Sequence, residues 1–381
     1  MTVIIFLIIL GLLILSHEFG HFFIAKRSGV RVDEFGLGFP PRLWSISRGE
    51  TTYSINLIPF GGFVKIHGEN PDEESLSGAD RKRAIGAQSK WIQAAILAAG
   101  VTANLVLAWL LLIIAFSTTG LPTQSGAVPT GYKLDNPQVT IVHVEDNSPA
   151  ALAGLIPGDQ IVQLRATNER LTKPTTEDIQ TFVANHPDSE IIVGYIRTHG
   201  PDIKPTIAER AVRPAKIGPD GSPRGEAGKS AIGIAMETIG LLRLSFPRAI
   251  IAGSQSVWHL TSSTIIAFGV FIANLVSGQN GALAQVTGPV GLVGLVGDAS
   301  ALGFGYLLLF TALISINLAV LNLLPIPALD GGRLLFLLIE KIKGNPIKPS
   351  VANAINLTGF VLLMGLMLLV TYGDIMKFFV R

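Results

Sequence analysis

The chain has 381 residues, which is enough for two or three domains. Hydrophobic residues make up 49% of it and charged residues only 15%. Because soluble domains carry about 25% charged residues, this composition indicates a membrane protein. The net charge of +2 gives no reason to expect a nucleic-acid partner. The chain contains no cysteine, so disulfides and thiolate metal ligands are excluded.

The first apolar run, residues 3–25, contains the sequence His-Glu-Phe-Gly-His. On a helix, His17 and His21 lie one turn apart on the same face, as two ligands of a zinc ion would. Glu18 between them can act as a general base. Ionisable residues inside a membrane are costly, so their presence here favours a function over a chance match. The run lacks a basic start and a small-residue cleavage site, so we expect a retained transmembrane helix.

Three further segments are apolar over the roughly 20 residues that a membrane span needs. They are Trp91–Phe116, Tyr306–Leu324 and Ile355–Tyr372. A fifth stretch, Ala249–Val276, carries many Ser and Thr residues and suits an amphipathic helix at the membrane surface better. The sequence therefore predicts a polytopic α-helical membrane protein with four transmembrane helices.

Basic residues are concentrated in two connecting segments. One covers residues 26–90 and includes Arg81-Lys82-Arg83, and the other covers residues 333–353. By the positive-inside rule both segments are cytoplasmic, and we read the Arg81–Arg83 cluster as an orientation signal rather than a lipid site. Both termini and the stretch 117–305 are then expected outside.

Residues 34–66 mix Gly and Pro with apolar alternation. Tyr53, Ile55 and Leu57 fall on one face, as strand residues do. This predicts a short β-structure that is too apolar for an ordinary solvated loop.

Residues 128–238 form a separate, more polar block. A short helix from Pro149 to Ala153, the turn Pro157-Gly158-Asp159 and a following strand resemble the signature of a PDZ domain. We expect a helix over Thr-Glu-Asp-Ile-Gln-Thr-Phe-Val-Ala-Asn, and Ile232–Ile234 as the last strand. The alternative is another small α/β domain.

A catalytic zinc ion takes three protein ligands, so His17 and His21 require a third. Without Cys it should be a carboxylate or His at a similar membrane depth. The third span ends in Asn-Leu-Leu-Pro-Ile-Pro-Ala-Leu-Asp-Gly-Gly-Arg, and Asp330 is the only acid within or beside it. The prolines predict a helix break, and Gly331-Gly332 allow unusual backbone angles. A solvent-facing aspartate at a helix end is the alternative.

Depth supports this pairing of Asp330 with the two histidines. His17 and His21 lie about 22 Å along the first helix at 1.5 Å per residue. The depths match only if the first and third spans run parallel, with one crossing between them. This requirement also argues against a span at 249–276.

These motifs together resemble the site-2 protease family of intramembrane zinc metalloproteases, and the bacterial members that cleave anti-sigma factors look most similar. The resemblance covers nearly the whole chain. It implies that His17, His21 and Asp330 bind Zn2+, that Glu18 is the catalytic acid/base, and that Asn322 binds substrate. It also implies that 34–66 is a membrane-reentrant β-loop and that 288–291 is the family's Gly-Pro-x-Gly element. The chain departs from the best-known member in having room for one PDZ domain instead of two.

The resemblance implies a domain order and a biological setting. The domains are 1–127 with the first two spans, 128–238 as an extracytoplasmic PDZ domain, 239–305 as a membrane-associated segment, and 306–381 with the last two spans. The expected site is a bacterial inner membrane, with the active site inside the bilayer toward the cytoplasm. The expected substrate is a single-span membrane protein already trimmed by a site-1 protease.

A rival interpretation is a non-catalytic PDZ-bearing adaptor or a metal-handling membrane protein with a vestigial site. The intact Glu18 favours the enzyme, because a vestigial site would be expected to lose it. Asn104 and Asn317 are expected to join helices. The five remaining histidines are expected to be structural or exposed: His67, His143, His186, His199 and His259. We expect the PDZ block to filter substrates by size rather than bind peptide ends.

Overall fold

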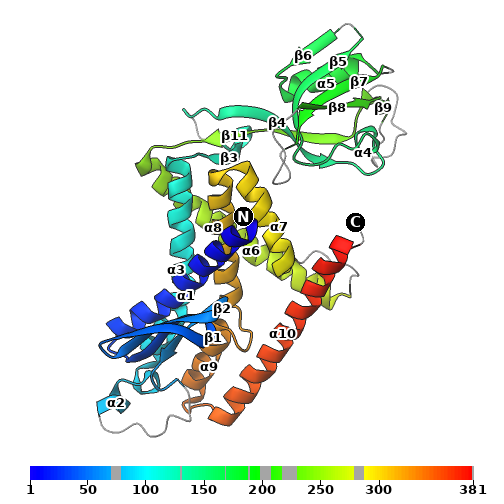
Figure 1. Cartoon of the computed structure of the whole chain (residues 1–381). Coiled ribbons are helices and arrows are strands. Elements are labelled where there is room, and N and C mark those ends of the chain that lie inside the picture. The colour runs from blue at the N-terminus through cyan, green and yellow to red at the C-terminus, as the bar shows by residue number, and fades with distance from the viewer. Residues whose placement is uncertain are drawn as a thin grey trace. The chain divides into compact units, whose positions relative to one another are not determined.

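The computed structural model describes residues 1–69, 79–128, 131–167, 169–187, 189–197, 207–216, 230–278 and 287–379 (Figure 1). The chain divides into two compact units. The first comprises residues 1–113, 250–296 and 310–381, and the second comprises residues 114–249 and 297–309. His199 lies outside the described residues.

Five described helices are long and apolar enough to cross a membrane. They are α1 (Thr2–Arg27), α3 (Lys90–Ser117), α6 (Phe246–Val276), α8 (Phe304–Leu323) and α10 (Pro349–Phe379). Four of them coincide with the predicted spans, and the chain is a membrane protein. The predicted count of four spans is not confirmed, because α6 is an unbroken helix that also meets the length and composition of a span.

Polar side chains join α6 to its neighbours. Trp109 Nε1 on α3 donates a hydrogen bond of 3.0 Å to Ser254 Oγ, and Thr264 Oγ1 donates one of 3.1 Å to Asn317 Oδ1 on α8. Asn317 therefore joins two helices, as predicted. Such bonds replace water contacts that a lipid-exposed polar group would lack.

Helices α1, α3 and α8 pack closely through small residues and hydroxyl groups. A Cβ on Gly20 of α1 would lie 2.2 Å from the carbonyl oxygen of Ala99 on α3, so only glycine allows this approach. Ser315 Oγ on α8 donates a 2.8 Å hydrogen bond to the carbonyl of Asn104, which is fully buried. Asn104 thus contacts α8 through its backbone, and its side-chain amide has no hydrogen-bond partner among the described residues.

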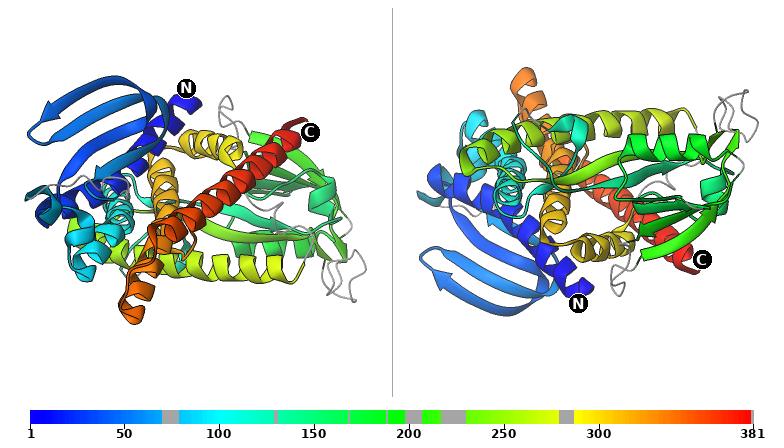
Figure 2. Two further views of the ribbon diagram at one scale, coloured as in Figure 1. Left: turned by 90° about the horizontal axis from the view of Figure 1, so that it is seen from below. Right: turned by 90° about the horizontal axis from the view of Figure 1, so that it is seen from above.

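The predicted β-structure is present as β1 (Val32–Arg48) and β2 (Thr51–Ile66). Both strands bend, so that residues 34–37 of β1 pair with 52–55 of β2 on one side and with 62–65 on the other, while 42–48 pair with 51–56. The result is a curved antiparallel sheet beside α1 (Figure 2), with 62–66 along one edge. Ile55 and Leu57 do share a face, and that face is exposed, whereas Ser54 and Asn56 on the other face are buried.

Ion pairs fasten the end of α1 to this sheet and to the short segment that follows it, α2 (Ala79–Lys82) and the 3-10 turn Ile85–Ala87. Glu50 receives hydrogen bonds from Arg83 at 2.7 and 2.8 Å and from Lys26 at 2.5 Å. Arg31 Nε donates to Asp33, whose other oxygen lies 3.1 Å from Nδ1 of the buried His67. His67 is therefore structural, as predicted.

Two shorter helices are α7 (Pro289–Leu302), whose first half up to Val296 belongs to the first unit, and α9 (Asp330–Lys343), which lies entirely in that unit. The Gly-Pro-Val-Gly element forms the start of α7. Asp374 near the end of α10 accepts a 2.8 Å hydrogen bond from the Gly291 amide, and a Cβ on Gly288 would approach its carboxylate to 2.8 Å. This element thus joins α7 to α10, a contact that sequence reasoning missed.

The second unit contains a sheet with the order β3-β11-β4-β5-β7-β8, and β6 pairs with β5. The strands are β3 (Leu121–Gln124), β4 (Asp135–Val144), β5 (Gln160–Ala166), β6 (Glu169–Thr172), β7 (Ile191–Ile196), β8 (Ile207–Val212) and β11 (Ile234–Leu242). The short β9 (Ala215–Lys216) and β10 (Ser230–Ala231) pair separately. A 3-10 turn, Ser125–Ala127, follows β3.

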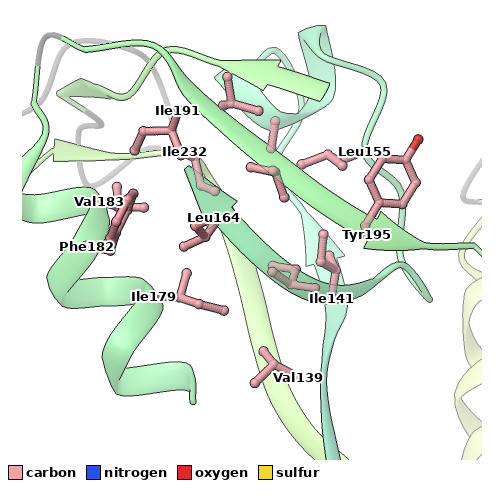
Figure 3. Packing of buried hydrophobic residues seen from close by; sticks show 14 of the residues in the cluster. Val139, Ile141, Leu155, Leu164, Ile179, Phe182, Val183, Ile191, Tyr195 and Ile232 are labelled. Atoms are coloured by element: carbon pink, nitrogen blue, oxygen red, sulfur yellow. The ribbon is translucent and has the colours of Figure 1, made fainter. Parts of the chain in front are cut away.

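Two helices accompany this sheet. Helix α4 (Pro149–Leu152) is capped by Ser148, and α5 (Thr176–Asn185) begins with a capping box between Thr175 and Asp178. Ile179, Phe182 and Val183 of α5 pack against Leu164, Ile191 and Ile232 in the core (Figure 3). The predicted helices and strands of this block are present. The last strand differs, because Gly233 forms a turn and β11 begins at Ile234 and continues to Leu242.

Candidate metal centre

Helix α1 places His17 and His21 one turn apart, and the start of α9 brings Asp330 to them. The two imidazole Nε2 atoms are 3.2 Å apart, and Asp330 Oδ2 lies 3.1 Å from that of His17 and 3.3 Å from that of His21. Ligands about 2.0–2.1 Å from a tetrahedral zinc ion are separated by about 3.3–3.4 Å. The three atoms therefore have the mutual spacing of a zinc site, and they are the metal-ligand cluster found among the described residues.

The contacts around these atoms favour the same arrangement. The Nδ1 of His21 lies 2.8 Å from the carbonyl oxygen of Ile96 on α3 and can donate to it, which leaves Nε2 free as a metal ligand. Asp330 Oδ2 is buried and has no partner of hydrogen-bond geometry among the described residues, although both imidazoles are near. The donor set of two imidazoles and one carboxylate thus meets the requirements for zinc.

Gly100 on α3 lies directly against the two histidines. A Cβ at this position would lie 2.3 Å from His21 Nε2 and 2.7 Å from His17 Cε1. Any side chain here would occupy the space of the imidazoles. Sequence reasoning missed Gly100 and Ile96. The small residues Ala99, Gly100 and Ala103 in an apolar helix were the available signal.

The backbone before Asp330 is bent into a tight turn. Helix α8 ends at Leu323, as Pro325 and Pro327 predicted, and Ala328 has a positive φ of 74°. Its amide donates a 3.2 Å hydrogen bond to Asn356 Oδ1 on α10. Asp330 then opens α9, where the helix dipole favours a carboxylate.

The expectation that Gly331-Gly332 take unusual backbone angles is wrong. Both lie in α9 and neither has a positive φ. They are needed for close approach instead, because a Cβ on Gly331 would lie 2.1 Å from the carbonyl oxygen of Leu324, and one on Gly332 would lie 2.3 Å from that of Ile326. The residue with the strained backbone is Ala328, a position that the sequence motif did not identify.

Glu18 lies on α1 between the two histidines and next to the β-sheet. A Cβ on Gly62 in the edge segment 62–66 would lie 3.3 Å from Glu18 Cγ, so this edge of the sheet is adjacent to Glu18. The carboxylate interacts electrostatically with His17, His21 and Asp330. Asn322 lies in the last turn of α8, eight residues before Asp330, and is half-buried. No side-chain hydrogen bond of Asn322 is present within the described part of the chain.

Comparison with known proteins agrees with this geometry. Residues 5–366 match peptidase family M50. The chain belongs to that family. It is 28% identical over 457 residues to the regulator of sigma-W protease RasP of Bacillus subtilis, with 99% of each chain covered. It is 28% identical over 453 residues to the zinc metalloprotease RasP of Bacillus licheniformis, again with 99% of each chain covered. A Clostridium perfringens protein provisionally named a zinc metalloprotease is 33% identical over 375 residues and covers 98% of each chain.

Membership of family M50 confirms the resemblance to site-2 proteases. The protein is a zinc metalloprotease of the membrane, and Zn2+ is its cofactor. The rival interpretation as a non-catalytic adaptor has no support from these relatives.

Proposed function

We propose that the protein hydrolyses a peptide bond within a transmembrane segment, with zinc held by His17, His21 and Asp330. The proposal depends on one observation: three ligand atoms lie 3.1–3.3 Å from one another. Two of them come from α1, a helix apolar enough to span the bilayer. A soluble protease with this motif would not need to place it 15 residues into an apolar run.

A zinc ion held by His17, His21 and Asp330 would supply Lewis-acid polarisation of the scissile carbonyl and would make the attacking water more acidic. Glu18 then acts as the general base that accepts the proton from the attacking water and delivers it to the leaving amine. Its position beside the ligands, but outside their set, fits this role. The hydrogen bond to the Ile96 carbonyl keeps the proton of His21 on Nδ1, so that Nε2 can bind the metal. Gly100 leaves room for both imidazoles.

The edge of the β-sheet next to Glu18 offers a place for the substrate. A peptide bond in a helix is shielded by its own hydrogen bonds, so the substrate must unwind locally. An extended substrate segment could pair with this edge of the sheet, at residues 62–64, by strand addition. Asn322 would bind the same segment from the opposite helix.

We propose a single-span membrane protein as the substrate, and an anti-sigma factor as its most plausible class. The name of the Bacillus subtilis relative, regulator of sigma-W protease, supports this class. The distribution of basic residues supports an inner-membrane protein with segments 26–90 and 333–353 in the cytoplasm and the 128–238 block outside.

Replacement of Glu18 by Gln tests the catalytic proposal. The variant should keep its zinc and lose cleavage of a fluorescent transmembrane peptide, because only the proton acceptor is removed. Zinc content and cleavage are measured on the same detergent-solubilised preparation. Full cleavage activity in this variant would overturn the mechanism.

The 128–238 block is proposed as a PDZ domain that controls access. Short connections, residues 118–120 and 243–245, tether its sheet to α3 and α6. A groove of about 660 Å³ lies between α5 and the start of β11. β3 pairs only with residues 239–242 of β11, so it does not cover residues 234–238. We propose that the domain acts mainly as a size filter, and the groove provides the site that a peptide-binding role would use.

Deletion of 128–238 separates the two roles. A filter predicts that the deletion variant cleaves substrates with an intact outer domain, and peptide binding predicts weaker cleavage of trimmed ones. Ala184→Trp fills the groove, and Glu177→Trp on the exposed part of α5 is the control. The filter would be overturned if Ala184→Trp, but not the control Glu177→Trp, lost cleavage of the trimmed substrate. It would also be overturned if the deletion variant still failed to cleave the untrimmed substrate.

A further inference from the structure

An ion pair that the family motif does not explain lies one turn beyond the third ligand. Arg333 follows Asp330 by three residues on α9, so both project from the same side of the helix. Its guanidinium pairs with the carboxylate of Glu69. Asp330 and Glu18 also attract the same guanidinium electrostatically. Arg333 is therefore paired with one carboxylate, Glu69, and is attracted by two further carboxylates that belong to the metal centre.

The backbone around Glu69 is built to place its carboxylate there. The edge segment of β2 ends at Ile66, and the Glu69 amide closes a turn on the Ile66 carbonyl at 3.2 Å. Gly68 has a φ of 71°, and a Cβ there would lie 2.5 Å from that of Ala84. The preceding residue, His67, is fixed on both sides by backbone hydrogen bonds to Arg31 and Ile85. Glu69 thus starts from an anchored turn rather than a loose strand end.

The alternative partner of Arg333 explains why this placement matters. A guanidinium has five donors in a planar fork and pairs readily with any carboxylate. Without Glu69, the carboxylate one turn earlier on the same helix is Asp330. An Arg333–Asp330 pair would compete with a divalent cation for the ligand, and the uncompensated positive charge would repel that cation.

We infer that Glu69 is a positioning residue that holds Arg333 away from Asp330 and so keeps this carboxylate available to the metal. The inference rests on the proposed role of Asp330 as a zinc ligand. It assigns Glu69, at the end of the β-sheet, a function in the metal centre without direct contact to the metal.

The pair is not needed to hold α9 in place. At the far end of the helix Glu340 accepts a 2.5 Å hydrogen bond from Lys90, and Lys341 Nζ lies 4.0 Å from the ring centroid of Trp91 on α3. The Glu69 and Arg333 side chains are 24% and 44% exposed, and ion pairs at such positions contribute little to folding. Variants at these two residues should therefore fold.

The inference is tested by measuring zinc affinity through chelator competition on the purified full-length protein. It predicts for each variant whether zinc binding becomes weaker, becomes tighter or stays unchanged. Glu69→Gln should weaken zinc binding about tenfold, the lower end for loss of an outer-shell partner. Arg333→Gln removes the competitor and should bind zinc at least as tightly as the wild type. The double variant Glu69→Gln/Arg333→Gln should return to within about twofold of the wild type. Lys90→Gln breaks a similar ion pair, with Glu340 about 10 Å further along α9, and should leave zinc affinity unchanged.

A merely structural role predicts a different pattern, in which both single variants weaken zinc binding and the double variant is no better. That result, or wild-type affinity in Glu69→Gln, would overturn the inference. Cleavage by Glu69→Gln should recover when zinc is added in excess, and failure to recover would also contradict it. A wild-type protein that bound no zinc would instead overturn the proposed function and the inference together.

Discussion

Substitution of Gly100 by Ala adds one methyl group beside the metal centre. The new carbon would lie 2.3 Å from His21 Nε2, whereas a normal contact needs about 3.4 Å. One side must therefore move by about 1 Å. Withdrawal of α3 from α1 would open the close contact between Gly20 and the Ala99 backbone and lose its packing. The imidazole of His21 is the part that must shift, and its hydrogen bond to Ile96 is then lost.

The expected effect on the site is large, and the expected effect on the fold is small. A displacement of about 1 Å in a catalytic group can cost about 100-fold in rate. Loss of an outer-shell hydrogen bond to a metal ligand typically weakens metal binding by about 10- to 100-fold. Overpacking destabilises a fold by about 1–3 kcal/mol, and the helix propensity of Ala over Gly offsets about 1 kcal/mol of this.

The measurements are zinc affinity by chelator competition, the rate of transmembrane-peptide cleavage, and thermal unfolding in detergent. Gly11→Ala is the matched control, because it lies on α1 and a Cβ there meets no atom within 4 Å. We expect Gly100→Ala to unfold within a few degrees of the control while losing at least about tenfold in zinc affinity. Wild-type affinity and activity in Gly100→Ala would refute the proposed arrangement of the two histidines.

Three further predictions follow from the structure. Asp330→Ala should lower both zinc content and cleavage, and normal zinc content in a folded variant would mean that another residue completes the site. Hydrogen bonds from Arg83 and then Lys26 lower the pKa of Glu50 to about 2. Their stabilisation is therefore complete above its unfolded pKa of about 4.3 and is lost as the pH falls toward 2, so unfolding of Glu50→Gln should lack this acid-dependent step. A cysteine introduced at Ser189 should react with an impermeant reagent in intact cells, and labelling only after disruption would reverse the proposed orientation.

The features that the sequence predicted well depend on local signals. The spacing of His17 and His21 in an apolar run predicts both the helix and the ligand pair, because a helix brings every fourth residue to one face. The prolines before Asp330 predict the helix break. In the second unit, turn residues and helix signals predicted α4, the strand that follows Asp159, and α5. The PDZ assignment itself stays a prediction.

The features that the sequence did not reveal depend on distant residues. Gly100 matters because α1 crosses α3 at that level, and no local pattern states where two helices cross. Gly331 was considered for the unusual backbone angles that it allows, yet its role is set by carbonyl groups of the preceding turn. The status of α6 could not be decided from its Ser and Thr content, because some of those hydroxyl groups bind α3 and α8.

Two elements beside the metal centre have the reverse of the polarity expected in a soluble protein. On α9, Asp330, Arg333, Glu340 and Lys341 contact the protein, while the exposed face carries Leu335, Leu338, Ile339 and Ile342.

On β2, buried Ser54 and Asn56 alternate with exposed Ile55 and Leu57, and Ser54 Oγ donates a 2.6 Å hydrogen bond to Glu34. In water this arrangement would be unfavourable, because apolar area would be exposed and polar groups desolvated. In lipid the same arrangement is favourable, since the buried side chains of Ser54 and Asn56 have hydrogen-bond partners inside the protein. The reversed polarity therefore gives a reason, independent of the apolar helices, for a metal centre that lies within the bilayer.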